Sequence, residues 1–582
     1  MNTAKTKYIK LRITVVGIFF AICLASIGAK AGYLQIYQSS WLAKKAADQY
    51  ERPFKESGKR GTIYDANLRE MAVSINITSI AAYPPRILNK NAAAKVIAKA
   101  LDMDANLLKR KLFSNKPFVW IKRRATPNEV YSVKSLNLEG LGFLSEHSRF
   151  YPQKTLAAQT IGFTGMDGNG LEGIEFYYDT QLKGSDHEFI VLKDALGHGF
   201  NSEKTSEADY SGSNLVLTID QAIQYITEKA LQEAVADNSA KSGIAIIMAP
   251  RTGAILAMAH YPLLNPNSYE KFDKHLWRNR AITDPFEPGS TMKIFTVAAA
   301  IEHGNSTPNT IFYCENGEYK IGKDIIHDTH PYGWLSLEDI VKYSSNIGAY
   351  KIGKKTGSEA LYRTLKDFGF GDKTGINCPG ETQGTLLPYK KWSAIDAGAI
   401  SFGQGISASP LQIISAVSAI ANDGVLMKPF IVQAILDQRG RTVKRFEPAP
   451  VRQAITSETA GAIKKILMSV VTKDGTGFNA ALEGYTVCGK TGTAQKINEK
   501  GEYAKGKYIS SFVGFAPVEN PEIAVLVILD EPMKNHYGGV VAAPAFGKIA
   551  QETLTYLNVP PKNRKTDRLT VSKPLEKNKV VI

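Results

Sequence analysis

Cysteine is scarce in this chain, with four residues among 582. No cysteine spacing resembles a zinc site, so neither a metal nor another cofactor is predicted. The composition shows no collagen-like or disordered bias, and no internal repeat is visible, which indicates a globular protein of roughly two to four domains. Long hydrophobic runs are equally few. Residues 13–29 form an uncharged run of 17 residues, and no second stretch is both long enough and apolar enough to cross a bilayer core.

The net charge of +16 at first suggests a nucleic-acid partner, but the charge is unevenly distributed. Residues 1–12 carry +4 and residues 561–582 carry +5, so 9 of the 16 charges lie in the two terminal segments. This pattern is typical of membrane topology and a solvated tail, so we expect no nucleic acid among the partners.

The apolar run predicts a transmembrane anchor over residues 13–32, preceded by a basic cytoplasmic tail, residues 1–12. Because positive charge stays on the cytoplasmic side, the remainder is expected to be exported, in a single-pass type II orientation. The sequence Ala29-Lys30-Ala31 could imitate a signal-peptidase site. The long apolar run and the amphipathic sequence after it favour a retained anchor.

The exported part is predicted to have an α/β (α+β) fold in two domains. Polar composition at 197–213 marks a boundary between an N-terminal α+β domain, residues 33–205, and a second domain, residues 206–558, before a basic tail at 559–582. The second domain has strand patterns at both ends and helical patterns between them, which predicts one antiparallel sheet flanked by helices. The expected elements are a strand at 215–219, a helix capped by Asp220, hairpins within 243–259 and 512–529, and a helix over 545–556.

The first candidate for chemistry is Ser290-x-x-Lys293, after a Pro-Gly break and before an apolar helix. The spacing puts both side chains on one helix face, near backbone N–H groups that favour developing negative charge. A serine beside an amine that burial can deprotonate is one form of activated nucleophile. Taken alone, the spacing is common enough to arise by chance.

Two further short motifs add to it. Ser344-Ser345-Asn346 is expected inside a helix that begins near Leu335, where a buried serine and asparagine could relay a proton and hold a substrate amide. Lys-Thr-Gly occurs at 355–357, 373–375 and 490–492. Context predicts a helix C-cap for the first and a loop for the second. The third follows a strand-like run, 484–488, and is expected on an edge strand that presents Lys490, with Gly492 allowing close backbone approach.

In this order, Ser290-x-x-Lys293, Ser344-x-Asn346 and Lys490-Thr-Gly492 resemble the three motifs of penicillin-binding proteins and serine β-lactamases. The resemblance covers nearly the whole chain and is closest to the class B penicillin-binding proteins. It implies a penicillin-binding transpeptidase fold on a non-catalytic (dimerisation-type) pedestal, residues 33–205. The stretches RGTIYD at 60–65, RFYP at 149–152 and GLEGIE at 170–175 resemble that pedestal, although ANL at 66–68 departs from its usual turn.

The lead-in to the serine, RNR at 278–280 and FEPGS at 286–290, is most similar to the division-specific, FtsI-type branch of peptidoglycan D,D-transpeptidases. The resemblance then implies that Ser290 attacks a D-Ala-D-Ala stem peptide and that Lys293, kept neutral by burial and the neighbouring cation Lys490, takes its proton. It also implies that penicillins acylate Ser290. The implied remaining roles are proton transfer by Ser344, orientation by Asn346, and binding of the substrate carboxylate by Lys490, Thr491 and Thr493. Gly492 is the further substrate-binding residue, and the backbone N–H groups of Ser290 and Thr493 form the implied oxyanion hole.

Several other functions are considered. No carboxylate that could activate a deacylating water is evident, which argues against a β-lactamase, and one span argues against a multi-span β-lactam sensor. A bifunctional enzyme would need a glycosyltransferase motif before residue 200, and none is apparent. Two alternatives stay open: an elongation-type class B transpeptidase and a non-catalytic scaffold that binds division proteins.

The expected partners are peptidoglycan stem peptides as donor and acceptor, β-lactam antibiotics, the membrane, a polytopic SEDS-type glycosyltransferase and other divisome proteins. The expected location is the inner (plasma) membrane at the division septum, with the catalytic domain in the periplasm. Two smaller groups are weighed as well. Cys314 and Cys378 could pair, although nothing in the sequence shows it. His327-Asp328-x-His330 could suggest a metal, but a loop before the Ser344 helix is the preferred interpretation.

Overall fold

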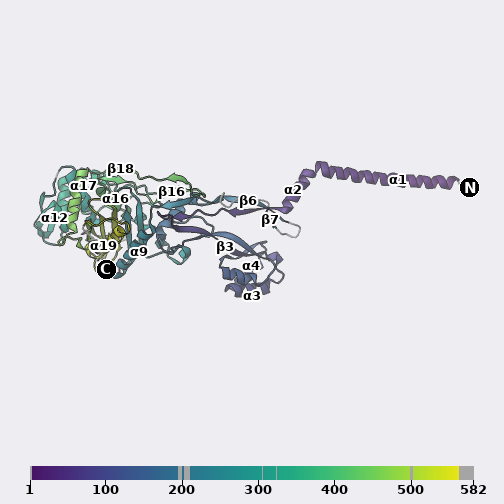
Figure 1. The fold of residues 1–582 in the computed structure, drawn as a ribbon, viewed down its shortest axis with the longest axis horizontal. Coiled ribbons are helices and arrows are strands. Elements are labelled where there is room, and N and C mark those ends of the chain that lie inside the picture. The colour runs from purple at the N-terminus through teal and green to yellow at the C-terminus, as the bar shows by residue number, and fades with distance from the viewer. Residues whose placement is uncertain are drawn as a thin grey trace, which may run out of the picture. The chain divides into compact units, whose positions relative to one another are not determined.

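The computed structural model describes residues 3–193, 199–201, 210–304, 306–322, 324–497 and 502–562. The chain divides into two compact units, residues 1–59 with 184–211 and residues 60–183 with 212–582. Figure 1 shows the elements of both units along the chain. The predicted tail at 559–582 lies mostly outside the described residues. The predicted domain boundaries stay predictions.

The first unit carries the apolar helix α1 (Thr3–Gly32), a short π-helical turn (Tyr33–Tyr37) and α2 (Ser39–Tyr50). In the described part of the chain, the segment Lys7–Tyr37 is the one helical stretch whose length and composition would allow it to cross a membrane. The residues that follow α1, 33–50, are also helical, with an interruption at Gln38. A three-stranded sheet in the order β1–β6–β7 completes the unit: β1 (Glu51–Ser57), β6 (Asp186–Lys193) and β7 (Gly199–Asn201).

The second unit begins with a hairpin, in which β2 (Ile63–Tyr64) pairs antiparallel with β3 (Glu70–Ala82). The departure at 66–68 does not prevent the turn, because the Asp65 carboxylate accepts hydrogen bonds from the backbone N–H groups of Asn67 and Arg69. The strand β3 also pairs with β4 (Val119–Ala125) and β5 (Leu141–Phe150). Three helices form a small apolar core beside β3 (Figure 1): α3 (Lys90–Leu101), α4 (Ala105–Leu112) and α5 (Pro127–Lys134).

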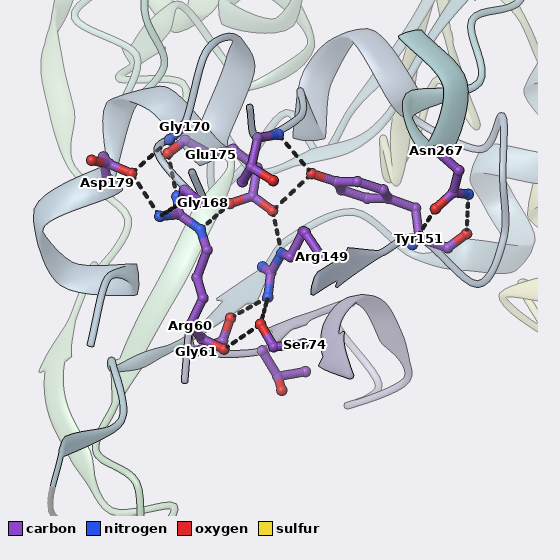
Figure 2. Close-up of polar contacts among 12 residues, drawn as sticks. Arg60, Gly61, Ser74, Arg149, Tyr151, Gly168, Gly170, Glu175, Asp179 and Asn267 are labelled. Carbon is purple, nitrogen blue, oxygen red and sulfur yellow. Dashed lines mark hydrogen bonds and ion pairs between the residues drawn. The ribbon is translucent and has the colours of Figure 1, made fainter. Parts of the chain in front are cut away.

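Three stretches that resemble the pedestal meet in one buried ionic network, drawn in Figure 2. Glu175 is fully buried, and its carboxylate accepts hydrogen bonds from Arg60 Nε and Arg149 Nε, both at 2.6 Å, and from the Tyr151 hydroxyl at 3.2 Å. Arg60 also binds Asp179 at 2.6 Å. Buried charges persist only when they are paired and hydrogen-bonded, so these residues hold the surrounding chain segments in one arrangement.

The glycine-rich stretch 160–174 lies beside this network, and residues 160–164, 170, 173 and 174 are buried in it. Phe163 is fully buried, and a Cβ at Gly162 (φ +78°) would lie 1.7 Å from the carbonyl oxygen of Glu172. Close backbone approach, which only glycine permits, explains the composition.

The main sheet is antiparallel and five-stranded, in the order β10–β9–β21–β20–β19. Helices α9 (Gln221–Asp237) and α19 (Ala543–Tyr556) pack on one face, and α16 (Pro410–Ala421) packs on the other. Both hairpins, the Asp220 cap of α9 and the C-terminal helix are as predicted. The strands are β9 (Ser242–Met248), β10 (Ile255–Tyr261), β19 (Cys488–Ile497), β20 (Tyr503–Ala516) and β21 (Ile523–Asp530).

A single apolar core binds the sheet to the helices that carry the candidate site. Helix α11 (Lys293–Glu302) is almost entirely buried, between α13 (Asn346–Thr356), α14 (Ser358–Asp367) and α17 (Ser457–Val470). Its sequence is apolar and alanine-rich on all sides, which is the pattern of a helix surrounded by protein. Burial of this helix fixes the depth at which Lys293, its first residue, lies.

Candidate active site

Ser290 lies on a short 3-10 turn (Gly289–Met292) that leads directly into α11. The turn contacts the edge strand β19. Gly289 has a φ of +55°, and a Cβ there would lie 2.9 Å from the Thr493 carbonyl oxygen, so glycine is required both for the turn and for this contact. The turn thus places the Ser290 side chain, which is half-buried, between the helices and the sheet edge.

Lys293 is fully buried. Its Nζ lies 2.6 Å from the Ser344 carbonyl oxygen and 2.8 Å from Asn346 Oδ1, two atoms that can only accept. It also lies 3.1 Å from Ser290 Oγ and 3.1 Å from Ser344 Oγ. A neutral amine has two hydrogens and one lone pair. The two obligatory acceptors use both hydrogens, which leaves the lone pair for a hydroxyl.

The Ser344–Asn346 motif does not lie inside one helix, so that prediction is wrong. Helix α12 (Leu337–Tyr343) ends at Ser344, which adopts the left-handed conformation (φ 63°, ψ 40°), and α13 begins two residues later, capped by Ser345. A non-glycine residue in this region is strained and persists where its surroundings hold it, often at functional sites. The break turns the Ser344 hydroxyl and carbonyl and the Asn346 amide toward Lys293 together.

Lys490 lies on β19, an edge strand of the sheet, as predicted. The strand itself begins at Cys488, so the preceding run 484–488 is mostly turn, contrary to prediction. Lys490 is fully buried, and its Nζ lies 3.0 Å from Ser344 Oγ and 3.1 Å from Thr491 Oγ1. One serine hydroxyl therefore connects the two buried lysines. A Cβ at Gly492 would lie 2.3 Å from Ser511 Oγ, so only glycine fits there.

Burial lowers the pKa of Lys293 to about 7, against an opposing influence of the Asp328 charge. It also lowers the pKa of Lys490 well below its usual value, and the Lys293 charge lowers it further. Two ammonium groups that share one buried site cannot both be comfortably charged, so the first proton lost near neutral pH belongs to the pair. The site therefore supplies a free amine at physiological pH. That Lys490 carries a positive charge in this site stays a prediction.

Ser290, Ser344, Asn346, Thr491 and Thr493 all line one cleft of about 1000 Å³. The lysines lie behind it. Aromatic and polar side chains form the rest of the wall, which suits an extended polar substrate. They include Tyr332, Tyr343, Phe402, Gln404, Thr476 and Phe478.

The remaining motifs lie elsewhere. The first Lys-Thr-Gly ends α13 with Gly357 at φ +90°, and the second lies in a loop, both as predicted. Among the described residues no group of His, Cys, Asp and Glu could hold a metal ion. The four cysteines, all described, are free thiols, and Cys314 and Cys378 form no disulfide.

One residue of the site escaped the sequence analysis. Asp328, part of the His327-Asp328-x-His330 cluster, accepts hydrogen bonds from the Ser345 hydroxyl and from two backbone N–H groups at the start of α13. In the sequence, Asp328 is marked only by its place in a polar cluster before a helix. That cluster was interpreted as a loop, without a role in the site.

A cleft-lining serine hydroxyl within hydrogen-bond distance of a buried lysine is the arrangement found in serine acyl-transfer enzymes. Comparison with known families agrees. The family model "Penicillin binding protein transpeptidase domain" matches residues 243–551, and "Penicillin-binding Protein dimerisation domain" matches residues 55–217.

Individual relatives match along almost the whole chain. A probable peptidoglycan D,D-transpeptidase, PenA, of Neisseria meningitidis is 35% identical over 557 residues, covering 94% of this chain and 93% of its own. The peptidoglycan D,D-transpeptidase FtsI of Escherichia coli is 33% identical, covering 96% and 93%. Penicillin-binding protein 3 of Mycobacterium tuberculosis, solved with aztreonam, is similar in structure, with a TM-score of 0.68 at 29% identity over 87% of this chain and 98% of that one.

The chain belongs to the penicillin-binding proteins, in the FtsI/PenA/PBP3-type class B group of serine peptidoglycan D,D-transpeptidases. The predicted class B resemblance, transpeptidase fold and enzyme class are confirmed.

Proposed function

We propose that Ser290 is the nucleophile that attacks the carbonyl between the two terminal D-alanines of a peptidoglycan stem peptide. The Ser290 oxygen bonds to the carbonyl carbon, the peptide bond to the last D-alanine breaks, and that residue leaves as a free amino acid. An amine from a neighbouring strand then attacks the acyl-enzyme ester and releases Ser290, which forms the crosslink. β-Lactams acylate the same hydroxyl. The alternative class, a non-catalytic scaffold, would not require this machinery.

The observation that carries the proposal is the pair of fully buried lysines joined to two serine hydroxyls. Lysine is almost never buried without a strong reason, since its charged form is costly away from water. A perturbed amine 3.1 Å from a cleft-lining hydroxyl is the arrangement that general-base activation of a serine requires.

Each surrounding residue then has a role. Lys293 takes the Ser290 proton, and Ser344, in contact with both lysines, passes a proton to the leaving amine. Asn346 orients Lys293 through Oδ1, and its Nδ2, which donates to the His327 carbonyl oxygen at 3.0 Å, keeps a second hydrogen for the substrate amide.

The sheet edge supplies the remaining contacts. Lys490, Thr491 and Thr493 hold the terminal carboxylate, while Gly492 lets the strand approach the serine turn closely. The backbone N–H groups of Ser290 and Thr493 form the oxyanion hole, where a donor contributes roughly 3–4 kcal/mol in comparable hydrolases.

The cellular setting is also part of the proposal. The apolar α1 supports a single-pass, type II anchor with the catalytic domain in the periplasm, and the similarity to FtsI supports a role at the division septum. A polytopic SEDS-type glycosyltransferase and other divisome proteins are the proposed partners. Depletion should produce filaments. Rounded cells would indicate the elongation-type alternative.

Labelled penicillin tests the chemistry directly. The full chain in detergent should form a covalent adduct that survives denaturation and maps by mass spectrometry to the peptide containing Ser290. Ser290→Ala should form none, whereas Ser457→Ala, at an exposed serine on α17, should react like the wild type. A wild-type protein that forms no adduct would support the scaffold, and an adduct on Ser290→Ala at this cleft would exclude Ser290 as nucleophile.

Acylation should also depend on pH. Below about pH 7 the Lys293 amine carries a proton and has no lone pair for the Ser290 hydroxyl, so the acylation rate should fall about tenfold per pH unit. Above that pH it should level off. Rates of penicillin acylation from about pH 5 to about pH 9, at constant ionic strength, measure the acid limb of the profile, which is the range in which the rate falls as the pH falls. A rate that is flat across neutral pH would contradict the role of Lys293.

A further inference from the structure

We propose that Asp328 is a positioning residue, which holds the junction between α12 and α13 in the geometry that Lys293 needs. This inference rests on the proposed function, because it assigns a residue to the same site. Asp328 lies in the loop after β13 (Asp324–His327) and does not line the cleft. It acts through the residues that do.

The Asp328 carboxylate accepts three hydrogen bonds from three consecutive residues. Oδ2 accepts from the Ser345 hydroxyl at 2.5 Å. Oδ1 accepts from the backbone N–H of Asn346 and, at 3.1 Å, from that of Ile347. Ser345 Oγ in turn accepts from the backbone N–H of Gly348 at 2.9 Å. The first turn of α13 therefore has its free donors satisfied from a separate loop, which fixes where the helix starts.

The start of α13 decides where two contacts of Lys293 lie. The carbonyl oxygen of Ser344 and the Oδ1 of Asn346 stand on either side of Ser345, at 2.6 and 2.8 Å from the lysine Nζ. Ser344 is in the left-handed region, which a serine leaves readily once its neighbours release it. The three hydrogen bonds at Asp328 thus restrain the three residues that directly follow this strained residue.

The carboxylate also acts by charge. Asp328 raises the pKa of Lys293 against the lowering caused by burial, and Lys490, whose own pKa is lowered by burial and by the Lys293 charge, is the other titratable group at this lysine. On its own side, Asp328 faces the Cys314 thiol and the Tyr332 hydroxyl, whose pKa values burial and the Asp328 charge both raise. Neither group carries charge at neutral pH. Removal of the carboxylate should therefore move the acid limb of the acylation rate to lower pH.

Two substitutions separate geometry from charge. Asp328→Asn keeps Oδ1 for the two backbone N–H groups and can donate to Ser345 Oγ, so it removes the charge and little else. Asp328→Ala removes the restraint as well. Asp324→Asn, an exposed carboxylate on β13, is the matched control. Penicillin acylation rates of the three full-chain variants are measured against pH, with adduct mapping on the wild type in parallel.

For Asp328→Ala we expect the plateau rate above pH 7 to fall by about tenfold or more, as when general-base geometry is lost. For Asp328→Asn we expect a plateau near that of the wild type and an acid limb at lower pH. The Asp324→Asn control should match the wild type both in its plateau rate and in the pH of its acid limb. A plateau for Asp328→Ala within about twofold of the wild type would overturn the proposal, and so would an unmoved limb in Asp328→Asn. If Asp328→Ala does not fold, Ser345→Ala decides the question of geometry, because it removes the Ser345 hydrogen bond to Asp328 and keeps the charge: its plateau should fall below that of the wild type, and an unchanged plateau would overturn the proposal. A wild type without a Ser290 adduct would instead refute the proposed function.

Discussion

Lys293→Met protein is expected to be acylated by penicillin about a thousandfold more slowly than the wild type, within the range that general-base catalysis supplies. Methionine fills much of the buried volume but has no lone pair of comparable basicity. Its thioether also leaves the Ser344 carbonyl oxygen and Asn346 Oδ1 without their donor. The measurement is the second-order acylation rate in detergent, followed over hours to capture slow reaction.

The control is Lys355→Met, at an exposed lysine in another Lys-Thr-Gly tripeptide. It makes the same substitution in the same domain and should leave acylation unchanged. A Lys293→Met rate within about tenfold of the wild type would show that Ser290 is activated by another group, with Lys490 as the first to test.

The second large effect concerns stability. Glu175→Gln should lower the free energy of unfolding by about 3–5 kcal/mol, the usual cost of breaking a buried ion pair by removing one partner. Glutamine keeps the shape of the side chain, but it leaves Arg60 and Arg149 paired to a neutral amide in a buried site. Arg60 retains Asp179, which limits the loss. Chemical unfolding followed by tryptophan fluorescence measures the change.

Glu359→Gln provides the matched comparison, because it breaks an exposed ion pair with Arg363 on the surface of α14. Exposed pairs one helical turn apart contribute only about 0.3–0.5 kcal/mol, so this variant should unfold almost like the wild type. Equal losses in the two variants would mean that the Glu175 network contributes no more than a surface pair.

Much of the fold was predictable because it depends on local periodicity. The apolar run before residue 30, the two hairpins of the main sheet and the Asp220 cap are each set by residues within about one element's length. Ser290 and Lys293 were found for the same reason, since helical spacing alone puts them on one face. Their roles depended further on the resemblance to a known family.

The break at Ser344 was not predictable in the same way. Apolar spacing continues from α12 into α13, and neither glycine nor proline marks the turn, so one helix was the simplest interpretation. A serine adopts the left-handed region there because Lys293, 51 residues away, binds its carbonyl oxygen, and because Asp328 caps the next helix. The close packing of Gly162 and Gly170 was not predictable for a similar reason. The carbonyl oxygens that these glycines approach belong to Glu172 and Glu175, which lie in a later turn of the chain.

The amino-acid sequence by itself indicated which elements form, which serine and lysines could react, and that an apolar helix long enough to cross a membrane lies near the N-terminus. Only the tertiary structure decided that the two lysines share one serine hydroxyl, that Asp328 serves the site, and that Arg60 and Glu175, 115 residues apart, are paired in the interior. The physical reason is that secondary structure follows from neighbours along the chain. Burial, which sets the charge of a lysine and the worth of an ion pair, depends on everything that packs around it.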